Sequence, residues 1–212
     1  MTYKMYLLDI HDLEDKSLSE EAMTLIDDKR REIANKYCKE KDRLRAIAAG
    51  LLLQVGFLEL EQNERDAKEL IAELKVRAEK DPNVFPTKLI YQKSEYGKPY
   101  WDKQALEAEL AESVWSSKKL WHFNLSHSGE YVVLIVADTE VGVDVQEERN
   151  VKHYPGGYKE FSRMEAYVKC TGEGFSRGHK IYEEYRGKVP GYEFFELELL
   201  EEYALWLCFR KD

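Results

Sequence analysis

Three short strand-like runs follow one another near the middle of the chain, and they constrain its fold more than any other feature. Residues 123–126 precede a turn at Ser128 and Gly129, and residues 131–136 and 141–145 come after it. Runs of this length, rich in valine and bounded by turn residues, are typical of β-strands. Strands joined by such short connections pair antiparallel. The region therefore predicts an antiparallel sheet.

Helical patterns lie on both sides of these strands. Ser17 and Glu20 have the spacing of a capping box and open a predicted helix that continues to Tyr37. Further apolar stripes predict helices over residues 44–56, 63–80, 104–112 and 161–171, the last ending at Thr171 and Gly172. Residues 3–10 and two runs between 193 and 209 are predicted strands. Helices and antiparallel strands in both parts of the chain predict an α+β fold.

A weak internal repeat bears on domain organisation. The segment GEYVVLIV at residues 129–136 is echoed by EEYALWLC at residues 201–208. A length of 212 residues fits one large domain or two small ones. We therefore expect two related halves, residues 1–138 and 139–212.

The balance of charge excludes some classes of function. The chain has 32 lysines and arginines against 41 acidic residues, a net charge of −9, whereas a general nucleic-acid binder needs a basic surface. No run approaches the roughly 18 apolar residues of a membrane span, and residues 1–11 lack a signal-peptide core. We expect a cytoplasmic monomer that binds neither nucleic acid nor membrane, with Cys38, Cys170 and Cys208 as buried free thiols.

One segment departs from the acidic average. Residues 29–45, which include Lys29 and Arg45, hold eight basic and three acidic residues. Such a run is either a solvated helix face or a local site for one anionic ligand. The rest of the chain must decide between the two.

An acid and an amide follow each other at alternate positions of the third strand-like run. Side chains alternate along a strand, so Asp144 and Gln146 point to one face while the valines around them point to the other. Carboxylate and amide oxygens are ligands for a hard cation such as Mg²⁺. The alternative is an ordinary polar strand face.

Glu165 and Lys169 are neighbours on one face of the last predicted helix because they are four residues apart. They form either a plain helix ion pair or a site in which a carboxylate binds metal or accepts a proton beside a cation that meets a phosphate.

A serine and a histidine are adjacent in the segment Asn124-Leu125-Ser126-His127-Ser128-Gly129. Adjacent side chains on an extended segment point apart, and there is no GxSxG elbow, so a nucleophilic serine is disfavoured. His127 at a turn can instead contact an anion, helped by hydroxyls and backbone amides.

Taken in order, these motifs resemble the 4′-phosphopantetheinyl transferases of the surfactin-synthetase-activating (Sfp) type. The matching segments are Tyr96-Gly97-Lys98-Pro99, Asn124 to Gly129, Gly142-Val143-Asp144-Val145, and Glu165-Ala166-Tyr167-Val168-Lys169 with Gly172 and Gly174. The basic run of residues 29–45 falls where that family places contacts to coenzyme A phosphates. The resemblance covers most of the chain and is looser at both ends.

The resemblance implies two similar α+β halves with coenzyme A between them as substrate. It implies transfer of 4′-phosphopantetheine to a serine of an acyl or peptidyl carrier protein, with release of 3′,5′-ADP. Asp144, Gln146 and Glu165 fall at the positions of the Mg²⁺ ligands. Glu165 matches the general base, and Lys169 would meet the diphosphate. The remaining coenzyme contacts implied are Lys29, Arg45, Lys98, Ser126 and His127.

The chain departs from the family pattern at several positions. Gln146 stands where many members have a third acid, which should weaken Mg²⁺ binding. Met164 and Phe161 replace a usual lysine and a usual tryptophan. Only 20 residues separate Asp144 from Glu165, where the family has a longer segment that helps to receive the carrier. A rival hypothesis is therefore a catalytically impaired binding module for coenzyme A or a carrier, and a third is a metal-dependent phosphoesterase on small nucleotides.

Overall fold

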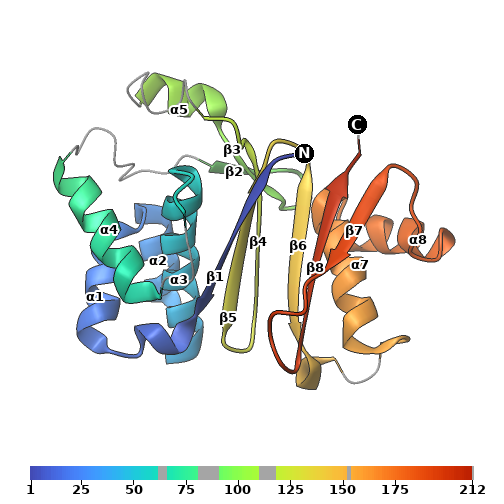
Figure 1. Cartoon of the computed structure of the whole chain (residues 1–212), viewed down its shortest axis with the longest axis horizontal. Helices are drawn as coiled ribbons and strands as arrows, with labels where there is room; N and C mark the ends of the chain where they lie inside the picture. The colour runs from blue at the N-terminus through green and yellow to red at the C-terminus, as the bar shows by residue number, and fades with distance from the viewer. Residues whose placement is uncertain (62–65, 81–90, 110–117, 152–153, 212) are drawn as a thin grey trace.

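The computed structural model describes residues 1–61, 66–80, 91–109, 118–151 and 154–211. Within these ranges seven α-helices and three antiparallel sheets confirm the predicted α+β class. Helices cover the outer face of one sheet, a second sheet packs on its inner face, and further helices cover that second sheet (Figure 1).

The first sheet contains strands β1 (Tyr3–Asp9), β5 (Tyr131–Ala137) and β4 (His122–Ser128), in the order β1-β5-β4. Both of its pairings are antiparallel, and Ser126 of β4 lies opposite Val133 of β5. Strand β5 is buried on both faces, because Leu134 packs against the helices and Ile135 packs against the second sheet. This explains its unbroken apolar sequence.

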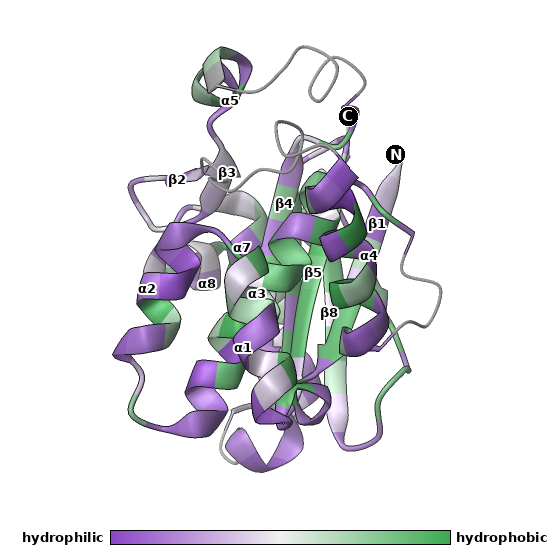
Figure 2. Ribbon diagram, turned by 90° about the vertical axis from the view of Figure 1, so that its left-hand side faces the viewer, coloured by the Kyte–Doolittle hydropathy of each residue, from purple (hydrophilic) through white to green (hydrophobic). Residues whose placement is uncertain are grey.

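Four helices cover the outer face of the first sheet: α1 (Lys16–Leu25), α2 (Asp28–Lys36), α3 (Glu40–Phe57) and α4 (Ala67–Lys80). The long α3 is buried over most of its length against β5 and β1. Figure 2 shows hydrophobic strands behind helices that carry both hydrophilic and hydrophobic residues.

Four predictions about these helices were wrong in detail. The helix predicted to reach Tyr37 is two helices, because Asp27 caps a new start by accepting a hydrogen bond from the Arg30 N–H. The capping box at Ser17 is not used, since Asp15 is the N-cap of α1. Gly56 does not end α3, which continues to Phe57. The helix predicted over residues 63–80 begins at Ala67, and residues 63–65 and 81 and 82 lie outside the described residues.

The second sheet contains β6 (Val141–Glu147), β8 (Tyr203–Arg210) and β7 (Tyr192–Glu196), in the order β6-β8-β7. Helix α7 (Gly157–Thr171) packs on its outer face and ends at Gly172, which has a left-handed φ of 66° as the predicted C-cap requires. Helix α8 (Phe175–Glu184) follows and was not predicted.

Gly142 sets how closely α7 lies against β6. A Cβ at this position would lie 2.1 Å from the carbonyl oxygen of Ala166 and 2.4 Å from the backbone nitrogen of Cys170. Only glycine therefore permits the observed contact. The close approach places the neighbouring Lys169 over β6.

A small hairpin of β2 (Tyr91–Lys93) and β3 (Pro99–Trp101) lies beside β4. The predicted turn before Pro99 is confirmed, with Gly97 at a φ of 87° and its N–H donating to the carbonyl of Ser94. Helix α5 (Lys103–Glu109) follows, and residues 110–112 of the predicted helix lie outside the described residues. Short 3₁₀ turns at Ile10–Leu13 and Glu148–Asn150 complete the elements.

The predicted boundary between residues 138 and 139 falls in the connection from β5 to β6. The facing sides of the two sheets share one apolar core, which includes Val133 and Ile135 of β5 together with Val143 of β6 and Leu207 of β8. The similarity of the two halves stays a prediction.

Among the described residues no helix combines the length and the apolar character needed to cross a membrane. Two of the three cysteines, Cys170 and Cys208, are buried free thiols as expected. Cys38 is exposed, which corrects that part of the prediction, because it lies between α2 and α3 where the chain leaves the core.

Candidate functional site

Strands β4 and β6 belong to different sheets but lie alongside each other, joined by side chains. Three alternate residues of β4 accept hydrogen bonds from alternate backbone N–H groups of β6. The pairs are Asn124 Oδ1 with Val143 at 3.0 Å, Ser126 Oγ with Val145 at 3.2 Å, and Ser128 Oγ with Glu147 at 3.0 Å. We call this line of contacts the β4–β6 seam. It satisfies N–H groups that would otherwise be unpaired at a sheet edge.

A compact polar cluster lies in the middle of the seam. Ser126 Oγ donates to Asp144 Oδ1 at 3.0 Å. Lys169 Nζ, which reaches in from α7, donates to Asp144 Oδ1 at 2.5 Å and to Ser126 Oγ at 2.9 Å. Asp144 is only 4% exposed, so its charge is compensated inside the protein. The structure thus brings together three residues that come from three separate sequence motifs.

Glu165 lies one helical turn before Lys169 on α7 and is partly buried. Desolvation raises the pKa of its carboxyl group; the Lys169 ammonium opposes this, and the Asp144 carboxylate adds to it. The two acids therefore act on each other electrostatically. The Asp144 carboxylate disfavours the charged form of Glu165 unless a cation is present.

The donor set of this cluster suits a hard divalent cation. Asp144 Oδ2 is buried and has no hydrogen-bond partner among the described residues, although Oδ1 has two. Gln146 follows on the same face of β6 and donates through Nε2 to Ser128 Oγ at 3.4 Å. No group of three or more histidine, cysteine or acidic side chains arranged to hold a metal is found among the described residues. A cation here would therefore complete its shell with water and ligand oxygens.

A cavity of about 230 Å³ opens next to Lys169. It lies between the β2–β3 turn, the start of β4, and the junction of α7 with α8. Its walls include Tyr96, Lys98, Asn124, Leu125, Lys169, Gly172 and Phe175. Lys98 donates through Nζ to the carbonyl of Cys170, and burial lowers the pKa of its ammonium. The cavity is thus lined by residues of three of the sequence motifs, at 96–99, 124–129 and 165–174. The fourth motif, at 142–145, does not line it.

His127 projects from the alternate face of β4 and is exposed. Its pKa is lowered, first by partial desolvation of the ring and then by the positive charges of Arg45, Lys169 and Arg30. Positive charges on α2, α3 and α7 therefore act electrostatically on this histidine. The arrangement favours an anion beside it.

Two residues of the basic run make contacts that differ from those expected of free phosphate ligands. Arg45 donates through Nε and Nη2 to the carbonyl of Gly129, at 2.9 and 2.6 Å, and through Nη1 to Asp42. Lys29 lies over the ring of Tyr91, with Nζ 4.4 Å from the ring centre. Arg45 thus lies near His127, whereas Lys29 lies against the small hairpin.

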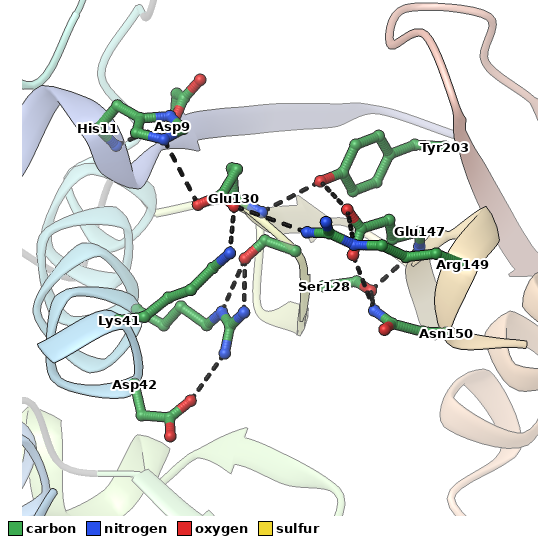
Figure 3. Close-up of polar contacts among 12 residues, drawn as sticks. Asp9, His11, Lys41, Asp42, Ser128, Glu130, Glu147, Arg149, Asn150 and Tyr203 are labelled. Carbon is green, nitrogen blue, oxygen red and sulfur yellow. Dashed lines mark hydrogen bonds and ion pairs between the residues drawn. The ribbon is translucent and has the colours of Figure 1, made fainter. Parts of the chain in front are cut away.

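A second polar network ties the tip of the β4–β5 hairpin to both sides of the molecule (Figure 3). We call it the hairpin-tip network. Glu130 pairs with Lys41 of α3, and its N–H donates to Tyr203 Oη at 3.1 Å. Tyr203 in turn donates to Glu147 Oε1 at 3.2 Å, and Arg149 Nε pairs with Glu147 at 2.7 Å. The network anchors the lower end of the seam.

Sequence reasoning missed Asn124, Ser128 and Gly142 as residues with structural roles at the site. The alternation of Asn124, Ser126 and Ser128 is a signal that could have located the seam, because polar residues on one face of an otherwise apolar strand need partners. The glycine before Asp144 is a second signal, since glycine inside a strand marks close backbone approach.

No family model matches the chain. A search of characterised proteins gives a 4′-phosphopantetheinyl transferase, psf-1 of Bacillus pumilus, which is 33% identical over 81 residues. The match covers 27% of this chain and 35% of that protein, so the chain spans about a third of the relative's length. The similarity is weak and partial, and the protein matched is a 4′-phosphopantetheinyl transferase.

Proposed function

We propose that the protein transfers 4′-phosphopantetheine from coenzyme A to a serine of an acyl or peptidyl carrier protein, in a Mg²⁺-dependent reaction that releases 3′,5′-ADP. The observation that carries the proposal is the cluster of Ser126, Asp144 and Lys169 with Glu165 beside it, in which Lys169 also lines a cavity. The partial similarity to a known transferase supports it.

Asp144, Gln146 and Glu165 would hold the Mg²⁺ ion. The buried, unpartnered Oδ2 of Asp144 is the observation that supports this assignment. When bound, the ion would neutralise negative charge on the diphosphate of the coenzyme, which favours departure of 3′,5′-ADP. Gln146 contributes no charge, so phosphate and water oxygens would carry more of the coordination.

Glu165 would take the proton from the carrier serine while the serine hydroxyl oxygen attacks the β-phosphorus of the coenzyme. Burial raises the pKa of Glu165, which makes its carboxylate a better base than one in water. The new bond joins the serine oxygen to phosphorus, and the bond from phosphorus to the bridging oxygen of 3′,5′-ADP breaks. Lys169 would neutralise the charge that develops on that oxygen.

The remaining cations would position the coenzyme. His127 and Arg45 converge near one another, and Lys98 and Lys169 line the cavity. Arg45 and Lys98 each already donate to a backbone carbonyl, so a phosphate would meet side chains that are held in place. Ser126 would line the site, and Lys29 would need to leave Tyr91 to take part.

The test is incubation of the protein with coenzyme A, Mg²⁺ and a panel of apo carrier proteins. Intact mass spectrometry should show one phosphopantetheine added to a carrier and 3′,5′-ADP released. If no carrier is modified although coenzyme A binds, the protein is a binding module. If coenzyme A is hydrolysed without any carrier, it is a phosphoesterase.

A further inference from the structure

Asp144 depends on one positive charge. Its side chain is 6% exposed, and Lys169 is its ion-pair partner among the described residues. A buried carboxylate without compensation is strongly destabilising. The ammonium of Lys169 therefore occupies the position beside Asp144 where positive charge is required.

Ser126 holds that ammonium in place. Its hydroxyl accepts from Lys169 Nζ at 2.9 Å and from the Val145 N–H at 3.2 Å, and it donates to Asp144. A serine hydroxyl has one donor and two acceptor positions, so its capacity is fully used. The pair is part of a defined network.

Lys169 is nevertheless able to leave. Its side chain is 27% exposed and borders the cavity, and a lysine ammonium sits on a flexible four-carbon stem. An ammonium and a divalent cation at the same carboxylate repel each other. A diphosphate in the cavity would offer Lys169 another partner of opposite charge.

We propose that Lys169 is an internal counter-cation that occupies the position of the divalent metal at Asp144 until a bound diphosphate attracts the Lys169 ammonium away from Asp144. This rests on the proposed function for the identity of the diphosphate. Metal binding and coenzyme binding are then thermodynamically coupled, because each favours the state in which Lys169 has left Asp144, and the coupling is reciprocal.

The test measures Mn²⁺ binding to the full-length protein without coenzyme, by electron paramagnetic resonance of the free ion at a fixed, mildly alkaline pH. Lys169→Met and Lys169→Gln should each bind Mn²⁺ about tenfold more tightly than the wild type, since the competing charge is gone. Lys169→Gln keeps groups able to donate to Ser126 and Asp144, so it remains informative if Lys169→Met does not fold.

Two controls separate this effect from a general change in charge. Lys180→Met removes one positive charge from the exposed surface of α8, and Lys169→Arg keeps the charge at Asp144. Both should bind Mn²⁺ within about twofold of the wild type. Unchanged affinity in the two neutral Lys169 variants, or an equal rise in Lys180→Met, would overturn the proposal.

Coenzyme A is then added to the wild type and to Lys169→Gln. The factor by which it tightens Mn²⁺ binding should be larger in the wild type, and an equal factor in the two proteins would contradict the coupling. These readouts need no turnover. If carriers are modified but Mn²⁺ binding does not change as expected, the counter-cation role of Lys169 is rejected and the proposed transferase function is kept. If Mn²⁺ binding changes as expected but no carrier is modified, the counter-cation role is kept and the transferase function is rejected.

Discussion

Two polar clusters lie along the same β4–β6 seam and differ in how many of their carboxylate oxygens have hydrogen-bond or ion-pair partners. In the hairpin-tip network, Glu147 accepts from Tyr203, Asn150 and Arg149, and Glu130 pairs with Lys41. In the middle of the seam, Asp144 Oδ1 accepts two hydrogen bonds, and the buried Oδ2 accepts none from the described residues. A saturated network fixes geometry, whereas an unsaturated buried acid keeps capacity for a ligand.

The largest expected effect comes from removing the unsatisfied acids. Asp144→Ala and Glu165→Ala should each lower the rate of carrier modification by about a thousandfold or more, because the first removes a metal ligand and the second removes both a metal ligand and the base. Glu130→Gln in the hairpin-tip network should leave the rate within about threefold of wild type. Initial rates by intact mass spectrometry measure this, and near-full activity of either alanine variant would show that the site is elsewhere.

Removing the cation of the same cluster should cost less. Lys169→Ala should slow transfer by about a hundredfold, because one positioned charge is lost while the metal ligands remain. Single-turnover rates at saturating coenzyme A measure the effect. A loss as complete as that of Asp144→Ala would mean that Lys169 performs an indispensable step.

A change that leaves every polar group in place should still disturb the cluster. Gly142→Ala would put a methyl group 2.1 Å from the carbonyl oxygen of Ala166 and push α7 away from β6. We expect a loss of about 2 to 3 kcal/mol in the free energy of unfolding, measured by urea denaturation, and reduced activity in the folded fraction. Wild-type stability would show that α7 can shift without cost.

The hairpin-tip network should report on stability alone. Tyr203→Phe removes a hydroxyl that donates to Glu147 and accepts from the Glu130 N–H. The expected loss is about 1 kcal/mol in the free energy of unfolding, with carrier modification unchanged. A drop in activity at equal stability would connect this network to the site.

Asp27 provides the smallest effect and a useful contrast with Asp144. It too is buried, with an Oδ2 that has no partner among the described residues, but its other oxygen caps α2. Desolvation raises its pKa above the usual value. The folded state therefore binds more protons than the unfolded state, and this acid lowers stability as pH rises through the window between the two pKa values.

Asp27→Asn should remove that part of the pH dependence while keeping the cap, since asparagine is an equally good N-cap residue. Urea unfolding of the two proteins at several pH values between acidic and neutral measures the difference. The variant should gain stability relative to wild type as pH rises, and transfer activity should not change. A difference of opposite sign would contradict the assigned pKa direction.

Local patterns in the sequence predicted the elements that depend on local physics. The three central strands, the end of α7 at Gly172 and the turn at Gly97 follow from periodicity and glycine placement. Helix α8 was missed because Gly178 and several charged residues break its apolar pattern. The division of the first predicted helix at Asp27 was missed because the apolar stripe continues across it.

The structure brings together Ser126, Asp144 and Lys169, which the sequence had singled out, but in pairings that the sequence did not predict. The sequence places Lys169 four residues after Glu165, which suggested that they pair, yet the ion pair that Lys169 forms is with Asp144 on another element. That contact depends on how closely α7 approaches β6 at Gly142, a property of tertiary packing. The convergence of Arg45 on the Gly129 carbonyl depends equally on α3 meeting a distant hairpin.

The side-chain hydrogen bonds of the seam also fix the register of β4 against β6. A shift of one residue between β4 and β6 would turn Asp144 toward the apolar side and present a valine to Ser126, because side chains alternate along a strand. A molecule with the two strands in the shifted register would therefore lack the cluster of Ser126, Asp144 and Lys169. Correct docking of β4 on β6 is therefore what brings Ser126, Asp144 and Lys169 together.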